Sequence, residues 1–292
     1  MHVVVDHPDD DAWPLLTDIA AKHANGGRLK LQLMQEPSST CSLKCHCLVQ
    51  AAESVDDSID YIALLDADVT PHSTWLRALT IPLTDERIGG VTGTQWFEPD
   101  SGAAFGSWWR SSWNGGAMIP TIHFANPWAG SFALRRTDLL RSGLLEAWRH
   151  SIVDDGPIRE YLGSIGLKVV FAPSLIMINR ENCGPRYVLR WTTRMLTWSR
   201  LHEPSFYLSQ IHAAFSNLVL TANVFVIFAA GILACWGVLP ISSFDFWGSI
   251  TISLAALITA GLFCVAAYAS GRRCVEHSCS LRGDPIDPMS WR

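Results

Sequence analysis

The stretch IALLDADV (residues 62–69) ends an apolar run with two carboxylates, Asp66 and Asp68, one residue apart. The apolar run predicts a strand over 61–65, and side-chain alternation along it would point both carboxylates the same way. Two like charges side by side are favoured where both bind a divalent cation, Mg²⁺ or Mn²⁺, shared with a phosphate. The alternative is a polar turn before the next helix, with Asp68 near its N-terminus.

Strand-like and helix-like segments alternate on both sides of this stretch. Strands are expected over 2–5, 29–34, 61–65, 88–97 and 168–172, and helices over 11–24, 43–54, 71–81 and 136–142. This alternation predicts an α/β layer fold for residues 1–182, and open sheets of this kind bind ligands beyond the carboxyl ends of their strands. Because the chain opens directly in a strand, we expect an N-terminal strand of the sheet to be missing from it.

The C-terminal third contains two long uncharged stretches. No Asp, Glu, Lys or Arg lies between Glu203 and Asp245, or between Asp245 and Arg272. The segments 213–239 and 246–270 are each long enough to cross a bilayer, which takes about 20 apolar residues. We therefore predict two transmembrane helices within 205–271, followed by a tail over 272–292. Two buried helices of a soluble bundle are the alternative, although such helices usually keep a polar face.

Basic residues flank the two predicted spans on one side only, at positions 186, 190, 194, 200, 272 and 273. The positive-inside rule places the N-terminal domain and the tail in the cytoplasm. The eight cysteines then lie in a reducing compartment or in the membrane, where a disulfide framework is not expected. A net charge of −5 argues against a nucleic-acid partner. The basic cluster before the first span suits anionic lipid head groups.

Acidic residues recur where predicted strands end: Asp6, the Asp66/Asp68 pair, and Asp154 with Asp155. A nucleotide-sugar transferase needs such a set. One carboxylate holds the nucleoside, one pair places a metal on the diphosphate, and another takes the proton from the acceptor hydroxyl. Adjacent carboxylates resist joint ionisation, which suits a base, whereas the ordinary alternative for 154–155 is a helix N-terminus.

The order of these motifs resembles a known family. In sequence order they are Asp6, LKCHCLVQA (43–51), LLDADV (64–69), WAGSFALRR (128–136), IVDDG (152–156) and RYVLRW (186–191). The chain resembles family 2/21 glycosyltransferases of the ceramide glucosyltransferase type, including bacterial hopanoid-associated relatives. The resemblance covers nearly the whole chain and lies in the ordered combination of motifs.

The resemblance implies a GT-A fold, a UDP-sugar donor, Mg²⁺ or Mn²⁺, inversion at the anomeric carbon and a membrane lipid acceptor. It assigns Asp66 and Asp68 to the metal and diphosphate, Asp155 to the general base, and Arg190 with Trp191 to an element that covers the diphosphate. The family has Gln or Arg where this chain has Tyr187, with Arg186 one position earlier.

Two further residues complete the predicted donor site. Lys44, at the start of a predicted helix, is expected near a phosphate. Asp6 is the first choice for the nucleoside carboxylate, and a shift of one residue would place His7 there instead.

Segment 183–204 is predicted to be an amphipathic helix at the membrane surface, because Arg186, Arg190 and Arg194 share a face. Five tryptophans lie in the sequence between the Asp66/Asp68 pair and Asp155, at positions 96, 108, 109, 113 and 128. They either form ordinary core or line an entrance for the sugar or the lipid. The cysteines at 41, 45 and 47 lack the second ligand pair that a zinc site needs.

The predicted function is a membrane-bound inverting transferase with its catalytic domain in the cytoplasm. It would move a hexose, glucose by the resemblance, from a UDP-sugar to a lipid hydroxyl such as that of ceramide. A polysaccharide-synthase-type transferase is one alternative. The second alternative is a truncated, non-catalytic partner that binds nucleotide or lipid. The expected loss of an N-terminal strand and the presence of Tyr187 support it.

Overall fold

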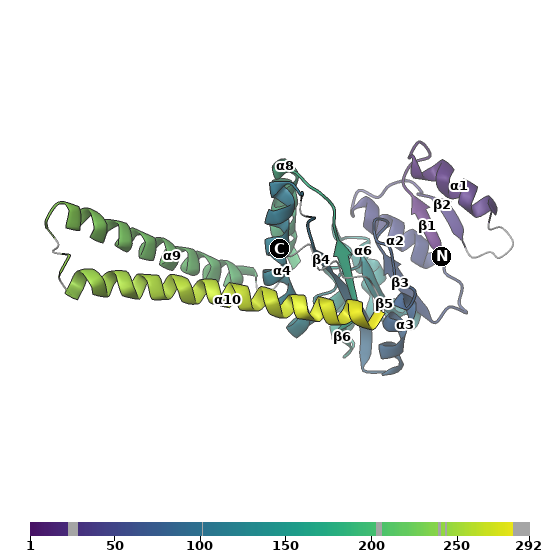
Figure 1. Cartoon of the computed structure of the whole chain (residues 1–292). Coiled ribbons are helices and arrows are strands. Elements are labelled where there is room, and N and C mark those ends of the chain that lie inside the picture. Colours follow the sequence, from purple (N-terminus) through teal and green to yellow (C-terminus); the bar gives the residue numbers. More distant parts are fainter. Residues whose placement is uncertain (23–28, 101, 203–205, 239–240, 243, 283–292) are drawn as a thin grey trace.

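The computed structural model describes residues 1–22, 29–100, 102–202, 206–238, 241–242 and 244–282. An α/β domain occupies the N-terminal part, and two long helices project from it (Figure 1). Its helices are α1 (Ala12–Lys22), α2 (Leu43–Glu53), α3 (Trp75–Thr80), α4 (Phe105–Phe124), α5 (Arg136–Ser142), α6 (Leu144–Trp148), α7 (Ile158–Ser164) and α8 (Pro185–His202). A 3₁₀ turn, η2 (Ile81–Thr84), follows α3.

The strands form two sheets rather than the single open sheet that we expected. β1 (His2–Val5) and β2 (Lys30–Leu33) pair in parallel. The other four strands follow the order β3-β5-β4-β6 and comprise β3 (Tyr61–Leu65), β4 (Ile88–Phe97), β5 (Ser131–Arg135) and β6 (Lys168–Asn179). β5 runs antiparallel to both neighbours, whereas β4 and β6 are parallel. The predicted α/β layering is confirmed, and its main sheet is mixed.

One strand and one helix differ clearly in extent from the sequence prediction, and one helix was not predicted. β6 continues to Asn179 instead of ending at 172, and its pairing with β4 shifts between Phe171 and Ile176. Pro173 lies within this irregularity, where a residue without an amide hydrogen is tolerated. The helix expected from 71 begins only at Trp75, after a turn that Trp75 N closes on His72 O. Helix α4 was not predicted, because its aromatic residues were interpreted only as core or as the lining of a sugar or lipid entrance.

Central strand β5 is buried on both faces. Phe132 and Leu134 join a core with helices α5, α6 and α7, into which α2 sends Cys45 and Val49. Ala133, which alternation points to the other face, joins a core with α3 and η2. The two helical layers therefore hold β3 and β5 firmly, and the loops after these strands start from a rigid base.

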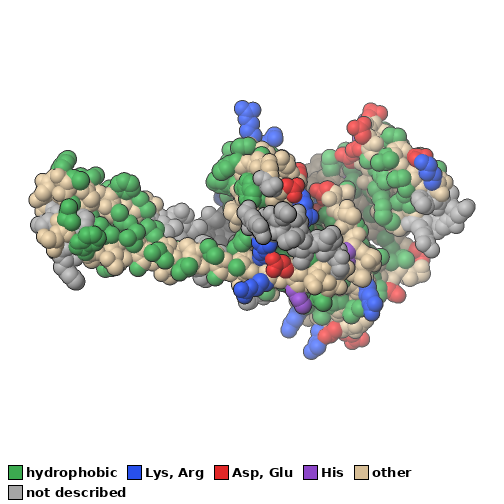
Figure 2. Space-filling view, viewed as in Figure 1, with side chains coloured by type: hydrophobic (Ala, Val, Ile, Leu, Met, Phe, Trp, Pro, Cys, Tyr) green, Lys and Arg blue, Asp and Glu red, His purple; other side chains and the backbone are tan. Residues whose placement is uncertain are grey.

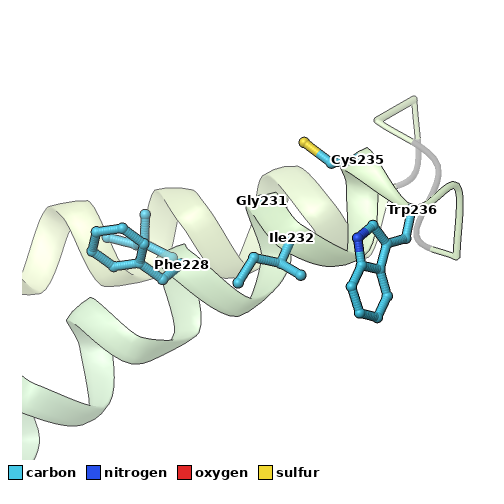
Figure 3. Close-up of a pocket in the computed structure, with 6 residues that line it drawn as sticks. Phe228, Gly231, Ile232, Cys235 and Trp236 are labelled. Atoms are coloured by element: carbon cyan, nitrogen blue, oxygen red, sulfur yellow. The ribbon is translucent and has the colours of Figure 1, made fainter.

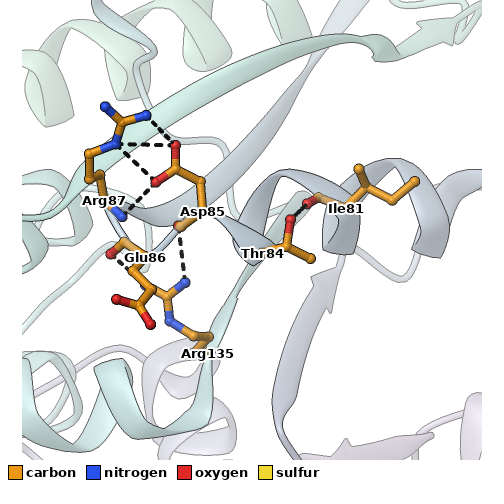
Figure 4. Close-up of polar contacts among 6 residues, drawn as sticks. All are labelled: Ile81, Thr84, Asp85, Glu86, Arg87 and Arg135. Atoms are coloured by element: carbon orange, nitrogen blue, oxygen red, sulfur yellow. Dashed lines mark hydrogen bonds and ion pairs between the residues drawn. The ribbon is translucent and has the colours of Figure 1, made fainter.

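Arg135, at the end of β5, ties that strand to the turn between η2 and β4 (Figure 4). Its guanidinium donates to the carbonyls of Leu83 at 2.6 Å and Ile88 at 2.8 Å. The Nε of Arg135 also forms an ion pair with Oδ2 of the buried Asp138, in helix α5, at 2.6 Å. Asp85 in the same turn accepts from Arg87. This charge-assisted network closes the end of the sheet opposite to the predicted site.

The projecting helices are α9 (Phe206–Cys235) and α10 (Phe244–Arg282), which pack side by side (Figure 1). Large apolar side chains are exposed along both, as the green surface of this arm in Figure 2 illustrates. Among the residues that the structure describes, no helix is long and apolar enough to cross a membrane. The two spans predicted within 205–271 are thus not confirmed, although helices occupy that segment.

The segment that we expected to be a tail begins inside α10. Val275 and Cys279 are buried with Trp96 and Ile176 of β4 and β6, and Tyr268 lies 5.3 Å from Trp96 between ring centroids. Residues 272–282 therefore pack on the outer strand of the sheet, and 283–292 lie outside the described residues. Covering an outer strand with a helix is a common way to protect its free edge.

Candidate active site

The start of α2 is held next to the loop that carries Asp154. Ser42 caps the helix, because its hydroxyl accepts from Cys45 N at 3.2 Å. The amide of Ser42 donates to Ser151 O at 3.0 Å, and Thr40 Oγ1 donates to Arg149 O at 2.7 Å. Lys44, in the first turn of α2, is thereby brought beside residues more than a hundred positions later in the chain.

The ammonium of Lys44 bridges two carboxylates. Its Nζ lies 2.6 Å from Asp66 Oδ1, just beyond β3, and 2.8 Å from Asp154 Oδ2. Asp154 is buried, and its backbone carbonyl accepts from the indole of Trp148 at 2.7 Å. Burial alone would lower the pKa of Lys44, but the charges of Asp154 and Asp66 outweigh it and raise that pKa. Lys44 is thus a fixed positive charge between two acids that the sequence predicted separately.

Asp155 is the titratable group of this cluster. Its pKa is raised to about 7, first because burial disfavours the charged carboxylate and then because Asp154 is negative; Lys44 acts in the opposite direction. A carboxyl group that changes its charge near neutral pH can accept a proton and release it again. The raised pKa predicted for one member of the 154–155 pair therefore falls on Asp155.

The Asp66/Asp68 motif lies in a turn rather than on the strand. β3 ends at Leu65, and Val69 N donates to Asp66 O at 3.1 Å, which closes the turn. Our expectation that strand alternation aligns the two carboxylates is therefore wrong, since the alternation stops before Asp66. Asp68 is exposed. Within the described residues, no three His, Cys, Asp or Glu side chains come together as a metal site.

Gly130 and Trp128 form the wall behind Asp66. Asp66 N donates to Gly130 O at 3.3 Å, where β3 and β5 leave each other. Trp128 is fixed by its own amide, which donates to Thr92 Oγ1 at 2.9 Å. Both residues lie in the motif WAGSFALRR (128–136), where Trp128 was expected to form core or to line an entrance and Gly130 had no expected role. This motif lies more than 60 residues beyond Asp66 in the chain, so no local signal placed it behind Asp66.

The remaining predicted residues lie outside this cluster. Asp6 follows β1 and is exposed; it is near Cys47 of α2, whose pKa is raised mainly by burial and further by the charge of Asp6. Arg190 is exposed on α8. Trp191 packs edge-on against Phe97 at 5.5 Å and Trp113 at 5.2 Å. In the part of the chain that the structure describes, no hydrogen bond or ion pair joins these three residues to Lys44.

A second polar centre that sequence reasoning missed surrounds Arg110 on α4. The buried guanidinium donates to Glu181 Oε2 at 2.6 Å and to Glu181 O at 2.7 Å. It also lies over the rings of Phe97 and Tyr187, at 4.7 and 5.9 Å from their centroids. A lone arginine in an aromatic stretch carries no sequence signal of such a role. Tyr187, which departs from the family pattern, is thus engaged with Arg110.

A groove of about 340 Å³ lies on α9, far from the Lys44 cluster (Figures 1 and 3). It is lined by Ile227, Phe228, Gly231, Ile232, Cys235 and Trp236. These side chains are almost all apolar and offer neither a general base nor a phosphate ligand. The carboxylate cluster, not this groove, is therefore the candidate active site.

Comparisons with known proteins found a similar solved structure and a matching family model. One solved structure that is similar, at 15% identity and a TM-score of 0.38, is mannosyl-3-phosphoglycerate synthase from Rubrobacter xylanophilus. The match covers 70% of this chain and 66% of that protein, and no curated protein matches. The sequence model of glycosyl transferase family 21 matches residues 2–275. Since that match covers nearly the whole chain, the protein belongs to glycosyl transferase family 21.

Proposed function

We propose that this family 21 glycosyltransferase moves a hexose, glucose in the lead case, from a UDP-sugar to a hydroxyl of a membrane lipid such as ceramide. The observation that carries the proposal is the convergence of Lys44, Asp66 and Asp154 beside Asp155. These groups offer a positive charge for a diphosphate and a base for an acceptor at one edge of the domain.

In this proposal Asp155 is the general base. It takes the proton of the acceptor hydroxyl while the acceptor oxygen bonds to the anomeric carbon, and the bond from that carbon to the diphosphate oxygen breaks with inversion. Burial, and after it the negative charge of Asp154, supports this role, because together they raise the pKa of Asp155 to about 7. A base with an ordinary aspartate pKa would hold the acceptor proton less strongly.

Lys44 and Asp66 are proposed to face the diphosphate. Lys44 keeps its charge at all physiological pH values, because its pKa is raised, so its ammonium can balance charge that develops on the leaving group. Asp6 would hold the nucleoside, and Arg190 with Trp191 would cover the diphosphate from α8. The role of Asp6 rests on the motif resemblance, and the roles of Arg190 and Trp191 rest on it together with the packing of α8 on α4.

Asp66 and Asp68 are the right kind of ligand for a divalent cation, but two protein ligands are too few to hold it alone. Asp66 and Asp68 supply hard carboxylate oxygens, the donors that Mg²⁺ and Mn²⁺ prefer, yet no third protein ligand joins them among the described residues. We therefore propose that Asp66 and Asp68 hold the cation only together with oxygens of the donor diphosphate. The cation would neutralise the diphosphate charge.

Membrane attachment through α9 and α10, with the domain on the cytoplasmic side, is part of the proposal. Exposed apolar side chains on α9, such as Phe225 and Phe228, and Trp236 in the turn that follows it support this attachment, because water-exposed apolar surface of this extent marks an interaction site. Exposed arginines on the preceding helix, Arg186 and Arg194 among them, carry the positive charge that the negative cytoplasmic lipid surface attracts.

The test is UDP release from UDP-glucose by the detergent-purified protein with Mn²⁺ and a mixed lipid extract. We expect Asp155→Asn and Asp68→Ala to abolish release, whereas Asp60→Asn, a substitution of an exposed aspartate outside the cluster, retains it. If UDP release survived Asp155→Asn, Asp155 would not be the general base. Wild-type protein that is folded and binds UDP but releases none from any lipid fraction would favour a binding role.

A further inference from the structure

Helix α4 is inverted relative to a helix that faces water. Phe105, Trp108 and Trp109 are exposed by 65%, 47% and 55%. Among the α4 residues whose burial the structure describes, the buried side chains are polar: Ser107, Arg110, Ser111, Asn114 and Thr121. A surface helix of a soluble domain normally buries its apolar stripe and exposes its polar one. The outward face of α4 therefore suits a surrounding that is less polar than water.

The buried polar side chains fix this orientation. Asn114 accepts from Phe97 N at 3.0 Å and donates to Phe97 O at 2.8 Å, as a strand partner would. Arg110 is anchored on Glu181, and Ser107 Oγ accepts from Cys183 N at 2.8 Å. Rotating α4 to bury its aromatic face would break all of these bonds inside the protein, where unpaired polar groups are costly. The aromatic face is thus held outward.

The exposed residues form one continuous surface. Phe105, Trp108 and Trp109 are spaced by three and four residues and share a helix face, and the rings of Phe105 and Trp109 lie 6.0 Å apart. Helix α4 also contacts α8 and α10. Leu189 is exposed by 69% on α8, and α10 continues into the apolar arm. Helix α4 is therefore a direct neighbour of two helices that also carry exposed apolar side chains.

The neighbouring charges identify what this surface contacts. Arg186 and Arg190 are exposed on α8, and no ion pair to either is found within the described residues. Tryptophan side chains combined with arginines are typical of the boundary between lipid head groups and acyl chains. We propose that the outward face of α4, formed by Phe105, Trp108 and Trp109, docks into the head-group region of an anionic bilayer.

This docking surface rests on the proposed membrane attachment and deepens it. Trp113, also on α4, contacts Trp191 of α8, so the docked face is joined through one aromatic pair to the element proposed to cover the donor diphosphate. A domain held by α4 would meet its lipid acceptor at the bilayer surface, rather than extract the lipid into water. The α9–α10 arm alone would tether the domain without settling which side of it faces lipid.

The experiment uses the full chain in vesicles of phosphatidylcholine and phosphatidylglycerol, with lipids brominated near the head-group end of their acyl chains. Bromine quenches tryptophan emission at short range. The chain has 13 tryptophans, so the readout is the difference between wild type and Trp108→Phe/Trp109→Phe. These substitutions remove the fluorophores and keep the apolar face. The matched control is Trp236→Phe/Trp247→Phe, on the exposed far part of the arm.

We expect quenching in the wild type and a clear loss of it in Trp108→Phe/Trp109→Phe, with matching protection of the wild-type emission from aqueous iodide. Equal quenching in wild type and Trp108→Phe/Trp109→Phe, with a loss only in Trp236→Phe/Trp247→Phe, would overturn the docking of α4 and leave attachment through the arm intact. No quenching in any of the three proteins would overturn both.

Discussion

Gly130 lies so close to Asp66 that a β-carbon at position 130 would come within 2.5 Å of Asp66 Oδ2. The same β-carbon would come within 2.3 Å of the Trp128 ring. Any side chain here must move a carboxylate that contacts Lys44, or the indole behind it. The closeness of these two residues explains why a glycine stands at the junction of β3 and β5.

Substitution Gly130→Ala should therefore misplace Asp66. We expect kcat to fall by about 10- to 100-fold, because displacements near 1 Å at a catalytic group have effects of this size. The measurement is UDP release under saturating donor, alongside the circular dichroism melting curve. Gly163→Ala is the control, since a β-carbon there meets nothing within 4 Å. Equal activity of the two variants would contradict a positioning role of Gly130.

Replacing Lys44 with methionine removes the charge that Asp66 and Asp154 share. We expect a stability loss of about 1–2 kcal/mol, less than for a fully buried pair because Lys44 is exposed on one side. Donor KM should rise, and the pH profile of kcat/KM should move to higher pH, because Lys44 lowers the pKa of Asp155. Lys22→Met, which breaks an exposed pair on α1, is the control. A pH profile of kcat/KM that does not move would show that Lys44 does not influence the pKa of the base.

The pH dependence of the wild-type enzyme should report Asp155. As a base it must be deprotonated, so kcat/KM should rise with pH through about 7 and then level off. Asp154→Asn removes the neighbouring negative charge and should move this rise to lower pH. A rise near pH 4 in wild type, the usual range of an aspartate, would show that Asp155 is not the titrating group.

The raised pKa of Asp155 also predicts that the folded protein becomes less stable as pH rises, whereas kcat/KM increases. The folded protein disfavours the Asp155 carboxylate, so the free energy of unfolding should fall as pH rises from the ordinary aspartate pKa, about 4, to about 7. Asp155→Asn should lack this part of the fall. Comparing the difference in Tm between variant and wild type at pH 5 and pH 8 measures it, and the variant should gain more at pH 8. An equal difference at both pH values would contradict the raised pKa.

Arg282 should stabilise the catalytic domain from the far end of the chain. Its Nη1 donates to Ser174 O at 2.9 Å and to Ile176 O at 2.7 Å, which are carbonyls of the irregular part of β6. Arg282→Ala should lower the free energy of unfolding by about 1–3 kcal/mol, as expected when carbonyls lose a charged donor. The measurement is a urea unfolding curve in detergent, with the exposed Arg273→Ala as control.

Local signals predicted the positions of most elements. Apolar runs ended by acids placed β1 and β3, and the α/β alternation of residues 1–182 is confirmed. The antiparallel place of β5 and the division into two sheets could not be predicted, because hydrogen-bond partners depend on long-range pairing that periodicity does not encode. Helix α4 escaped prediction because its exposed face is the aromatic one, the reverse of the pattern used to recognise helices.

The candidate site was predicted in its parts but not in its arrangement. Asp66 and Lys44 were chosen from separate motifs and Asp154 was named only as the neighbour of Asp155, and the sequence carries no sign that one ammonium joins the two acids. Gly130 and Arg110 act through contacts to residues far away in the chain, at Asp66 and Glu181, so no local pattern marks them. The expectation that Asp66 and Asp68 point the same way came from strand alternation, and it failed because the strand ends at Leu65.

Helix α10 runs without a break from the far part of the apolar arm to the outer strand of the sheet. Its 39 residues, at about 1.5 Å each, make a rod about 58 Å long. One end of this rod carries Trp247 and the other carries the buried Val275 and Cys279. Any tilt of the arm must therefore swing the sheet by the same angle. The thickness and curvature of whatever the arm enters would set how high above it, and at what slant, Asp155 is carried.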